Sequence, residues 1–231
     1  MRPERIRTTL ARALELLQAE HGRRQWQPEG SAVGELIGTI LSQNTTAANS
    51  SAGFRRLWRR FRSYEAMADA PVEEIERCIR VCGLSRIKAP RIRSILRQIR
   101  DRGPGRRIRL AFLDEMPVAE ATDYLLGFDG VGPKTAACVL MFAFSKPVFP
   151  VDTHVGRIAR RLGVVDDGAS PERVQEKLTP LIAPGDRCEL HLLLIAHGRQ
   201  ICRARNPRCN ICPLLRICAH GRTTGTGLAT A

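Results

Sequence analysis

The sequence predicts an all-α fold, and three observations lead to this prediction. Apolar residues recur at steps of three and four positions, which places them on one face of a helix. No segment shows the sustained alternation of apolar and polar residues that a half-buried strand requires. Short stretches of glycine, proline and polar residues separate the helical segments. With 231 residues, 43% of them hydrophobic, the chain is long enough to bury a core.

The first expected helix carries one apolar stripe, formed by Ile6, Leu10, Leu14 and Leu17, and the polar stretch 21–30 ends it. A second, apolar helix is expected at 36–41, with small polar residues over 42–51 around its end. The later helices of this half are expected at 54–61, from Pro71 to Gly83, and along the stripe Ile92, Ile95, Leu96 and Ile99, before a basic loop at 103–107.

The second half of the chain continues with helices joined by short turns. Two apolar helices, 118–126 and 133–144, are expected on either side of the turn 129–132. Further helices are expected at 153–162, 171–182 and 190–197. The tail 221–231 is rich in glycine and threonine, and we expect it to be disordered.

The charge of the chain indicates an anionic partner. Lysine and arginine number 37 against 23 acidic residues, which gives a formal net charge of +14. On a folded domain such an excess most often serves nucleic acid. A membrane span is excluded, because the longest apolar run is the nine residues 136–144. Nearly all the basic residues are arginines, and the four exceptions are Lys88, Lys134, Lys146 and Lys177.

The turn Gly130-Val131-Gly132 places backbone N–H groups at the start of the helix that begins at Pro133. The first N–H groups of a helix are unpaired and its dipole is positive there, so the turn is a candidate phosphate site. In a basic protein the natural anion is a DNA phosphate. Lys134 lies in the first turn of this helix, where the positive helix end favours a neutral amine that can act as a nucleophile.

Cysteine is unevenly distributed along the chain. Four cysteines lie singly in apolar or helical surroundings, and we expect them to be buried small hydrophobic side chains: Cys78, Cys82, Cys138 and Cys188. The other four lie within seventeen residues and are candidate metal ligands: Cys202, Cys209, Cys212 and Cys218. Their spacing alone favours structural zinc, because ferredoxin-type spacings differ from this one.

Taken together, these motifs resemble the endonuclease III family of DNA glycosylases. The segments 130–136 and Val151-Asp152-Thr153-His154 are similar to the helix–hairpin–helix motif and the Gly/Pro-Asp loop of that family. His197-Gly198-Arg199 and the four cysteines, separated by six, two and five residues, are similar to its iron–sulfur loop. The resemblance covers roughly residues 30 to 218.

The resemblance implies catalytic roles for Lys134 and Asp152. Lys134 would attack the anomeric carbon, expel the base and form a Schiff base, and β-elimination would then cut the strand on its 3′ side. Asp152 precedes a helix, where it can accept backbone N–H bonds and stay ionised, and it would stabilise the cationic sugar. Taken singly, a phosphate-binding lysine and an ordinary helix cap are the alternative interpretations.

The resemblance also implies a structural [4Fe–4S] cluster on Cys202, Cys209, Cys212 and Cys218, and it implies contacts with double-stranded DNA. Leu84 matches the leucine that enters the duplex, and the gap-filling glutamine corresponds to Asn44, or to Gln43 one residue earlier. The hairpin and the Gly/Pro-Asp loop supply the remaining DNA-binding residues, Gly130, Val131, Gly132 and His154.

Two departures from the family pattern leave the preferred base and its opposite base open. Ala47 replaces an acidic residue associated with recognition of the opposing strand or the extruded base, and Asp129 stands where proline is usual.

These implications lead to an expected organisation and function. Residues 31–146 would form one helical domain, residues 1–30 with 147–231 a second, and the DNA groove with Asp152 would lie between them. The expected activity is removal of damaged, oxidised pyrimidines with abasic-site lyase activity, by a bacterial cytoplasmic monomer associated with the nucleoid. The alternatives are a mismatch-specific uracil or thymine glycosylase and a non-enzymatic DNA-binding module with structural zinc. An adenine-mismatch glycosylase fits poorly, because that branch usually lacks the lysine.

Overall fold

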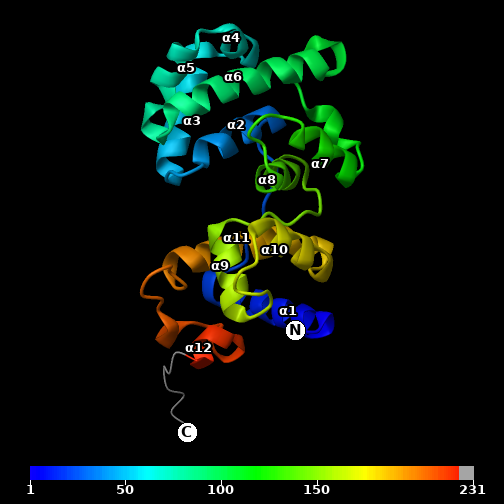
Figure 1. Ribbon diagram of the computed structural model, residues 1–231, viewed down its shortest axis with the longest axis vertical. Coiled ribbons are helices and arrows are strands. Elements are labelled where there is room, and N and C mark those ends of the chain that lie inside the picture. Colours follow the sequence, from blue (N-terminus) through cyan, green and yellow to red (C-terminus); the bar gives the residue numbers. More distant parts are fainter. Residues whose placement is uncertain (224–231) are drawn as a thin grey trace. The chain divides into compact units, whose positions relative to one another are not determined.

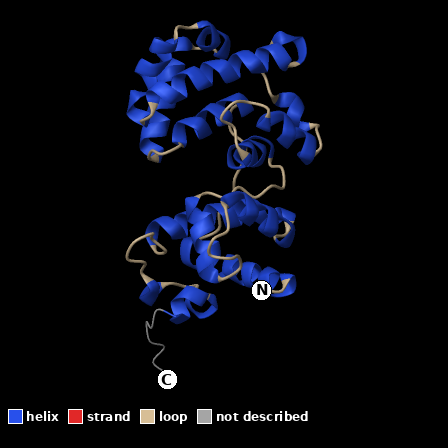
Figure 2. Cartoon of the chain, viewed as in Figure 1, coloured by secondary structure: helices blue, strands red, loops and turns tan. Residues whose placement is uncertain are grey.

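The computed structural model describes residues 1–223, and this part of the chain is helical with no strand (Figures 1 and 2). The predicted all-α class is therefore confirmed. The chain divides into an inserted unit, Pro28–Lys146, and a terminal unit, which joins Met1–Gln27 to the residues from Pro147 onward. The first boundary lies three residues before the expected position, and the second lies between Lys146 and Pro147. No helix within residues 1–223 combines the length and apolarity that crossing a bilayer requires.

The inserted unit is built around α2 (Ala32–Ser42), which packs against α8 and α3. Leu36 and Leu41 of α2 are fully buried. Ser31 begins the helix, because its hydroxyl accepts a hydrogen bond from the Gly34 N–H at 3.1 Å. The other helices of this unit are α3 (Ala47–Phe61), α4 (Tyr64–Asp69), α5 (Val72–Ile79), α6 (Ser85–Arg102), α7 (Val118–Leu126) and α8 (Pro133–Phe144).

The terminal unit has its core where α11 (Arg187–Gln200) packs against both α1 (Pro3–His21) and α9 (Thr153–Leu162). Leu17 and Leu193 are completely buried there, so each of these helices turns an apolar face inward. The other α-helices among the described residues of this unit are α10 (Pro171–Leu178) and α12 (Ala219–Thr223).

Several elements in the first half differ from the expected ones. Residues 47–51 form the first turns of α3 instead of a polar stretch outside the helices, because Thr46 caps the helix by accepting the Asn49 N–H at 3.2 Å. The short helix α4 is an addition, and Ser63 caps it in the same way. Pro71 is the residue before α5 and not its first helical position.

The C-terminal expectation is partly wrong. Gly221–Thr223, the first residues of the tail expected to be disordered, belong to α12, whereas 224–231 lie outside the described residues.

The interpretation of the single cysteines also changes. Cys82 and Cys138 are buried as expected, but Cys188 is only half-buried and so is Cys78, which lines a cleft with arginines of α3.

Candidate active site

The turn between α7 and α8 leaves an open surface at Gly132 but not at Gly130. Gly130 has φ +77°, and a Cβ at this position would overlap the Arg91 guanidinium of α6. The positive φ angle therefore favours glycine at 130, and the Arg91 side chain occupies the space where a Cβ would lie. A Cβ at Gly132 would meet no atom within 4 Å. The Val131 side chain is buried, and its N–H donates to the Phe128 carbonyl at 3.0 Å, so this residue holds the turn from inside.

Lys134 lies in the first turn of α8, directly after this open surface. No side chain caps the helix at Gly132, and Pro133 has no N–H, so the first backbone donors of α8 belong to Lys134 and Thr135. Such a helix start attracts an anion. The structure thus places a half-buried amine next to a candidate phosphate site, within one unit.

Lys134 also interacts with a carboxyl group that the sequence analysis did not single out. Burial raises the pKa of Glu35 on α2, while a hydrogen bond from Thr39 and the charge of Lys134 oppose that rise. The Thr39 hydroxyl donates to Glu35 Oε1 at 3.1 Å. The helical spacing of Glu35 and Thr39 was visible in the sequence, but the packing of α2 against α8 was not.

Asp152 begins α9 in the terminal unit. Its Oδ1 accepts a hydrogen bond from the Val155 N–H at 2.8 Å, which is the capping role expected of a carboxylate before a helix. His154 follows within the first turn, and its Nδ1 lies 3.1 Å from Nη2 of Arg157. Gly198 packs so closely on His154 that a Cβ there would lie 2.7 Å from His154 Nδ1.

The loops that carry the expected gap-filling residues have exposed tips. Gln43 ends α2 and is half-buried, whereas Asn44 is exposed with φ +54°. Leu84 stands before α6 with φ +51° and is 49% exposed. A left-handed conformation is rare for leucine, and an exposed apolar side chain there is typical of a residue held out for a partner.

Lys88 connects these two loops. Its side chain is 1% exposed, and Nζ donates to the carbonyls of Leu41 at 2.8 Å, Gln43 at 2.7 Å and Cys82 at 3.0 Å. Burial lowers the pKa of Lys88. The ammonium has three donors, and all three acceptors are backbone atoms beside the two loop tips. Lys88 thus links the loop of Gln43 and Asn44 to the loop of Leu84.

The four candidate metal ligands lie in the terminal unit after α11. All four are half-buried free thiols. Burial raises the pKa of Cys212 to about 11, and the charges of the other three cysteines act on Cys212 in the same direction. No three His, Cys, Asp or Glu side chains in residues 1–223 come together closely enough to hold one metal ion. Four thiols that act electrostatically on one another still form a donor set suited to iron or zinc.

Two arginines of α9 hold the beginning of the cysteine loop, and the sequence analysis missed both. Arg157 donates to the Cys202 carbonyl from Nε at 3.0 Å and from Nη2 at 2.8 Å. Arg161 Nη1 lies 3.2 Å from Cys202 Sγ and donates to the Arg203 carbonyl at 2.7 Å. The Cys218 thiol donates to the Arg161 carbonyl at 3.1 Å. Their i, i+4 spacing on one helix is the only sign of this role in the sequence.

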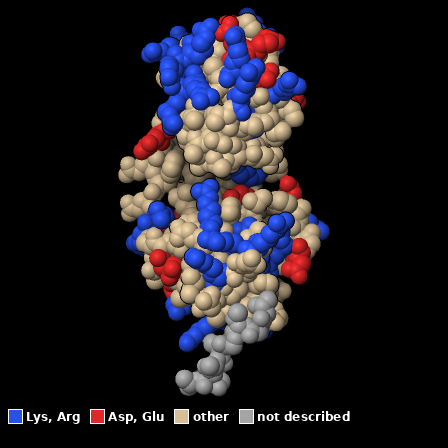
Figure 3. Space-filling view, turned by 90° about the vertical axis from the view of Figure 1, so that its left-hand side faces the viewer, with Lys and Arg blue, Asp and Glu red and all other residues tan. Residues whose placement is uncertain are grey.

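Arginine also dominates the surface of the inserted unit. Figure 3 shows Lys and Arg side chains gathered over the part of this unit that carries α4 to α6. Few of them have acidic partners, since the ion pairs among the described residues of this unit are Arg60–Glu74, Arg86–Glu76 and Arg100–Asp69. Such a surface can neutralise phosphates without discarding existing ion pairs.

Comparison with known proteins places the chain in one family. The family model described as the HhH-GPD superfamily of base excision DNA repair proteins matches residues 37–184. Endonuclease III of Thermotoga maritima is 35% identical over 192 residues, which cover 83% of this chain and 84% of that protein. Endonuclease III of Sulfolobus acidocaldarius is 32% identical over 187 residues and covers 80% of each.

A solved structure supports the same relationship over nearly the whole chain. The structure of a trapped covalent intermediate between endonuclease III and DNA, an estranged-adenine complex, superposes with a TM-score of 0.81 at 30% identity. The match covers 97% of this chain and 99% of that one.

Proposed function

Because the chain belongs to the HhH-GPD superfamily of base excision DNA repair proteins, as an endonuclease III-type DNA glycosylase with abasic-site lyase activity, we propose that it removes damaged pyrimidines through Lys134 and Asp152. The observation that carries this proposal is the position of Lys134 in the uncapped first turn of α8, beside the open turn at Gly132. A nucleic-acid phosphate bound at that turn would bring its sugar within reach of the amine.

The reaction follows from the groups available. The Lys134 amine forms a bond to C1′ as the bond from C1′ to the base breaks, and the base leaves with the electron pair. Opening of the sugar ring converts the adduct into a Schiff base. Loss of a proton from C2′ then expels the 3′ phosphate, which cuts the strand. We assign Asp152 to stabilise the positive charge that develops on the sugar, because the hydrogen bond from the Val155 N–H holds its carboxyl group at the start of α9.

We also propose that Cys202, Cys209, Cys212 and Cys218 hold a [4Fe–4S] cluster. The chemistry of four half-buried thiols that follow one another in a single loop supports it, since thiolates are the ligands of iron–sulfur clusters. When bound, the cluster would supply structural rigidity. Arg157 and Arg161 would then present the basic loop 203–208 on the platform of α9.

The test of the catalytic assignment is borohydride trapping on a duplex with one abasic site. Lys134→Gln should bind this DNA but form no covalent adduct. Lys134→Arg keeps the positive charge and should also form none, because a guanidinium cannot make the Schiff base. Strand cleavage by Lys134→Arg would refute the assignment. The other lysines, Lys88, Lys146 and Lys177, would then have to be tested as the nucleophile.

The cofactor assignment has a separate measurement. Purified protein should contain roughly four iron and four sulfide per chain and show broad visible absorbance. One zinc per folded, colourless chain would contradict the cluster. Cys209→Ser should lower the unfolding temperature before it lowers lyase activity, since the ligand holds a loop and takes no part in the reaction.

A further inference from the structure

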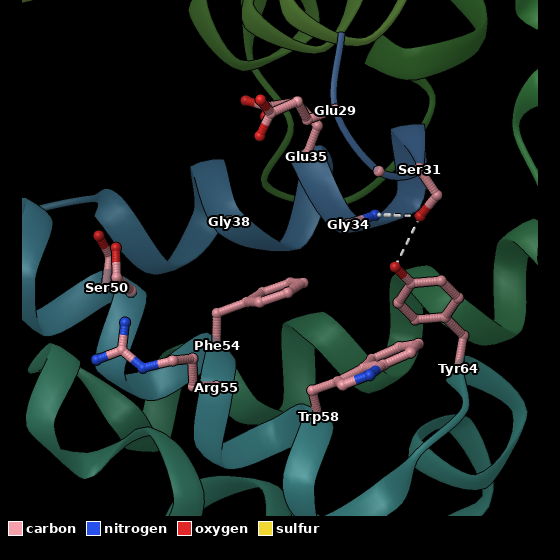
Figure 4. Close-up of a pocket in the computed structure, with 12 residues that line it drawn as sticks. Glu29, Ser31, Gly34, Glu35, Gly38, Ser50, Phe54, Arg55, Trp58 and Tyr64 are labelled. Atoms are coloured by element: carbon pink, nitrogen blue, oxygen red, sulfur yellow. Dashed lines mark hydrogen bonds between the residues drawn. The ribbon is translucent and has the colours of Figure 1, made fainter.

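Helix α3 presents two different sides to its neighbours. Phe54 and Trp58 line a cavity that α3 shares with α2 (Figure 4). The other side of α3 packs against α5, and a separate cleft of about 620 Å³ opens there. This α3–α5 cleft is lined by four arginines, one glutamate and one cysteine, namely Arg56, Arg59, Arg60, Glu74, Arg77 and Cys78. The cleft therefore carries an excess of positive charge.

Most of this positive charge is not neutralised within the protein. Glu74 forms an ion pair with Arg60. Arg56, Arg59 and Arg77 form no ion pair among the described residues, and all three are exposed. A guanidinium offers parallel N–H donors that match two oxygens of a phosphate group, and its charge strengthens both hydrogen bonds. The chemistry of the cleft therefore suits a phosphate.

Arginines from both helices converge on the floor of the cleft. Burial raises the pKa of the half-buried Cys78 thiol, and positive charges oppose that rise. These charges belong to Arg60 and Arg56 on α3 and to Arg77 on α5. Because guanidinium groups of two facing helices act on one thiol, a single phosphate above Cys78 can be bound from two sides.

The cleft lies along the helix pair that carries the loops expected to open the duplex. α3 begins after the loop of Asn44, and the loop of Leu84 follows α5. The Cys82 thiol donates to the Asn49 carbonyl at 3.3 Å, so both loops leave the same end of the pair. Arg56 lies two helical turns beyond Asn49, about 10 Å along α3 at 1.5 Å per residue. On a DNA strand this length corresponds to about three nucleotides.

We propose that the α3–α5 cleft binds a backbone phosphate of the DNA duplex about three base pairs from the extruded nucleotide. This inference rests on the proposed function, because the loops of Asn44 and Leu84 must be those that enter the duplex. Arg56 and Arg77 would hold the phosphate from the two helices. A phosphate contact carries no sequence information, so the cleft would fix the flanking duplex in place while the loops separate the bases.

A cycle of matched changes in protein and DNA tests this contact. On the protein, Arg56→Gln is combined with Arg77→Gln, and glutamine has nearly the helix propensity of arginine, so the double variant should fold. On the DNA, phosphates about two to four base pairs from a tetrahydrofuran abasic analogue are replaced with uncharged methylphosphonates, on one flank of one strand at a time. Fluorescence anisotropy measures the affinity of each protein for each duplex.

One of the modified duplexes should bind the wild type about tenfold more weakly than the unmodified duplex, the scale of a lost hydrogen bond to a charged group. The same modification should not change the affinity of the double variant, because the contact is already absent. The log–log salt slope of the double variant should be shallower by about 0.9, the share of one phosphate. If every modification weakens both proteins by the same factor, the cleft holds no phosphate and the proposal is wrong.

The matched control combines Arg106→Gln with Arg107→Gln. Both side chains are exposed and form no ion pair among the described residues, so the control removes the same charge from the same unit. They follow α6, whose 18 residues separate them from Leu84 by about 27 Å. The control should keep the tenfold effect of the modified duplex. Loss of that effect in the control as well would show that net charge, and not the cleft, determines binding.

The Cys78 thiol reports whether the cleft is occupied. Labelling of Cys78 in the wild type by iodoacetamide, followed by mass spectrometry of its peptide, should slow severalfold when the unmodified duplex is present at saturation. Inorganic phosphate at the same concentration should not slow it. Equal protection by inorganic phosphate would identify a site for small free anions, and no protection by the duplex would mean that the cleft stays empty in the complex. Either result would overturn the proposal.

These outcomes are distinguishable from failure of the proposed function. Binding and labelling require no bond to break, so the cycle stays interpretable whichever residue is the nucleophile. A covalent adduct formed by Lys134→Gln would overturn the proposed function alone. A covalent adduct formed by the wild type, together with equal effects of the methylphosphonates on both proteins, would overturn the cleft proposal alone.

Discussion

Replacing Lys88 with methionine tests the link between the two DNA-contacting loops. The change leaves the carbonyls of Leu41 and Cys82 buried without their donor, at about 1–3 kcal/mol for each unsatisfied group. Removing the buried ammonium also removes its desolvation cost, which offsets part of this penalty. We therefore expect the free energy of unfolding to fall by about 3 kcal/mol. For a protein of this size the unfolding temperature should fall by about 6–12 °C. The fold should survive, because proteins are stable by about 5–15 kcal/mol.

The functional effect of Lys88→Met should appear in binding. Freed loops must be ordered again on DNA, and ordering one residue costs about 1–2 kcal/mol, which weakens binding of an abasic-analogue duplex by about tenfold. Fluorescence anisotropy measures the affinity and circular dichroism the unfolding temperature. Lys146→Met is the matched control, since Lys146 donates to the carbonyls of Asp114 and Met116 away from both loops. If both variants weaken binding equally, the loop link proposed for Lys88 is wrong.

Three further predictions concern charge and protonation. Affinity for duplex DNA should fall with salt at a log–log slope of about −5 if six phosphates are neutralised, and a slope near zero in an anisotropy titration would mean that the arginine surfaces are merely solvated. Asp152→Asn keeps an oxygen that can accept the Val155 N–H, so the unfolding temperature of this variant should stay near that of the wild type. Base excision should fall by about 10²–10⁴-fold. Loss of folding would instead mark Asp152 as a structural cap. Burial raises the folded-state pKa of Glu35, so its charged form is less stable in the folded protein. The free energy of unfolding of the wild type should therefore fall relative to that of Glu35→Gln as pH rises from about 4.3 through the folded-state pKa. Urea unfolding of both proteins at pH 4 and pH 8 checks the sign of this difference.

The helices around the hairpin could be read from the sequence because local signals agree there. Val118–Leu126, Pro133–Phe144 and Thr153–Leu162 have the expected bounds, and each is bordered by a residue with a strong positional preference, such as Gly132 or Asp152. The roles expected of Lys134 and the four cysteines, which stay predictions, also rest on residue types and spacing along the chain. For such residues, local sequence contains most of the information.

The first turns of α3 could not be read in this way. Residues 47–51 are small and polar, which suggests a loop, but the helix they begin also includes Gly53, where a Cβ would overlap the Cys82 thiol. Close packing against the segment of Cys82 therefore depends on a missing side chain that a sequence pattern counts as a helix breaker. Glu35 and Lys88 were missed for a related reason, since their partners come from α8 and from loops distant in sequence.

The four lysines show what an arginine-rich chain keeps an amine for. Lys88 directs three donors at three backbone carbonyls inside a site that is 1% exposed, where a planar guanidinium is too large and diverges too far. Lys146 donates to two carbonyls from a single nitrogen. Lys134 lies where the proposed chemistry requires a group that can lose its proton and form an imine, which arginine cannot do. Lys177 alone has no such role among the described contacts. The scarcity of lysine is therefore best explained by two preferences. Arginine carries the surface charge, and lysine is kept where the geometry or the reactivity of an amine is needed.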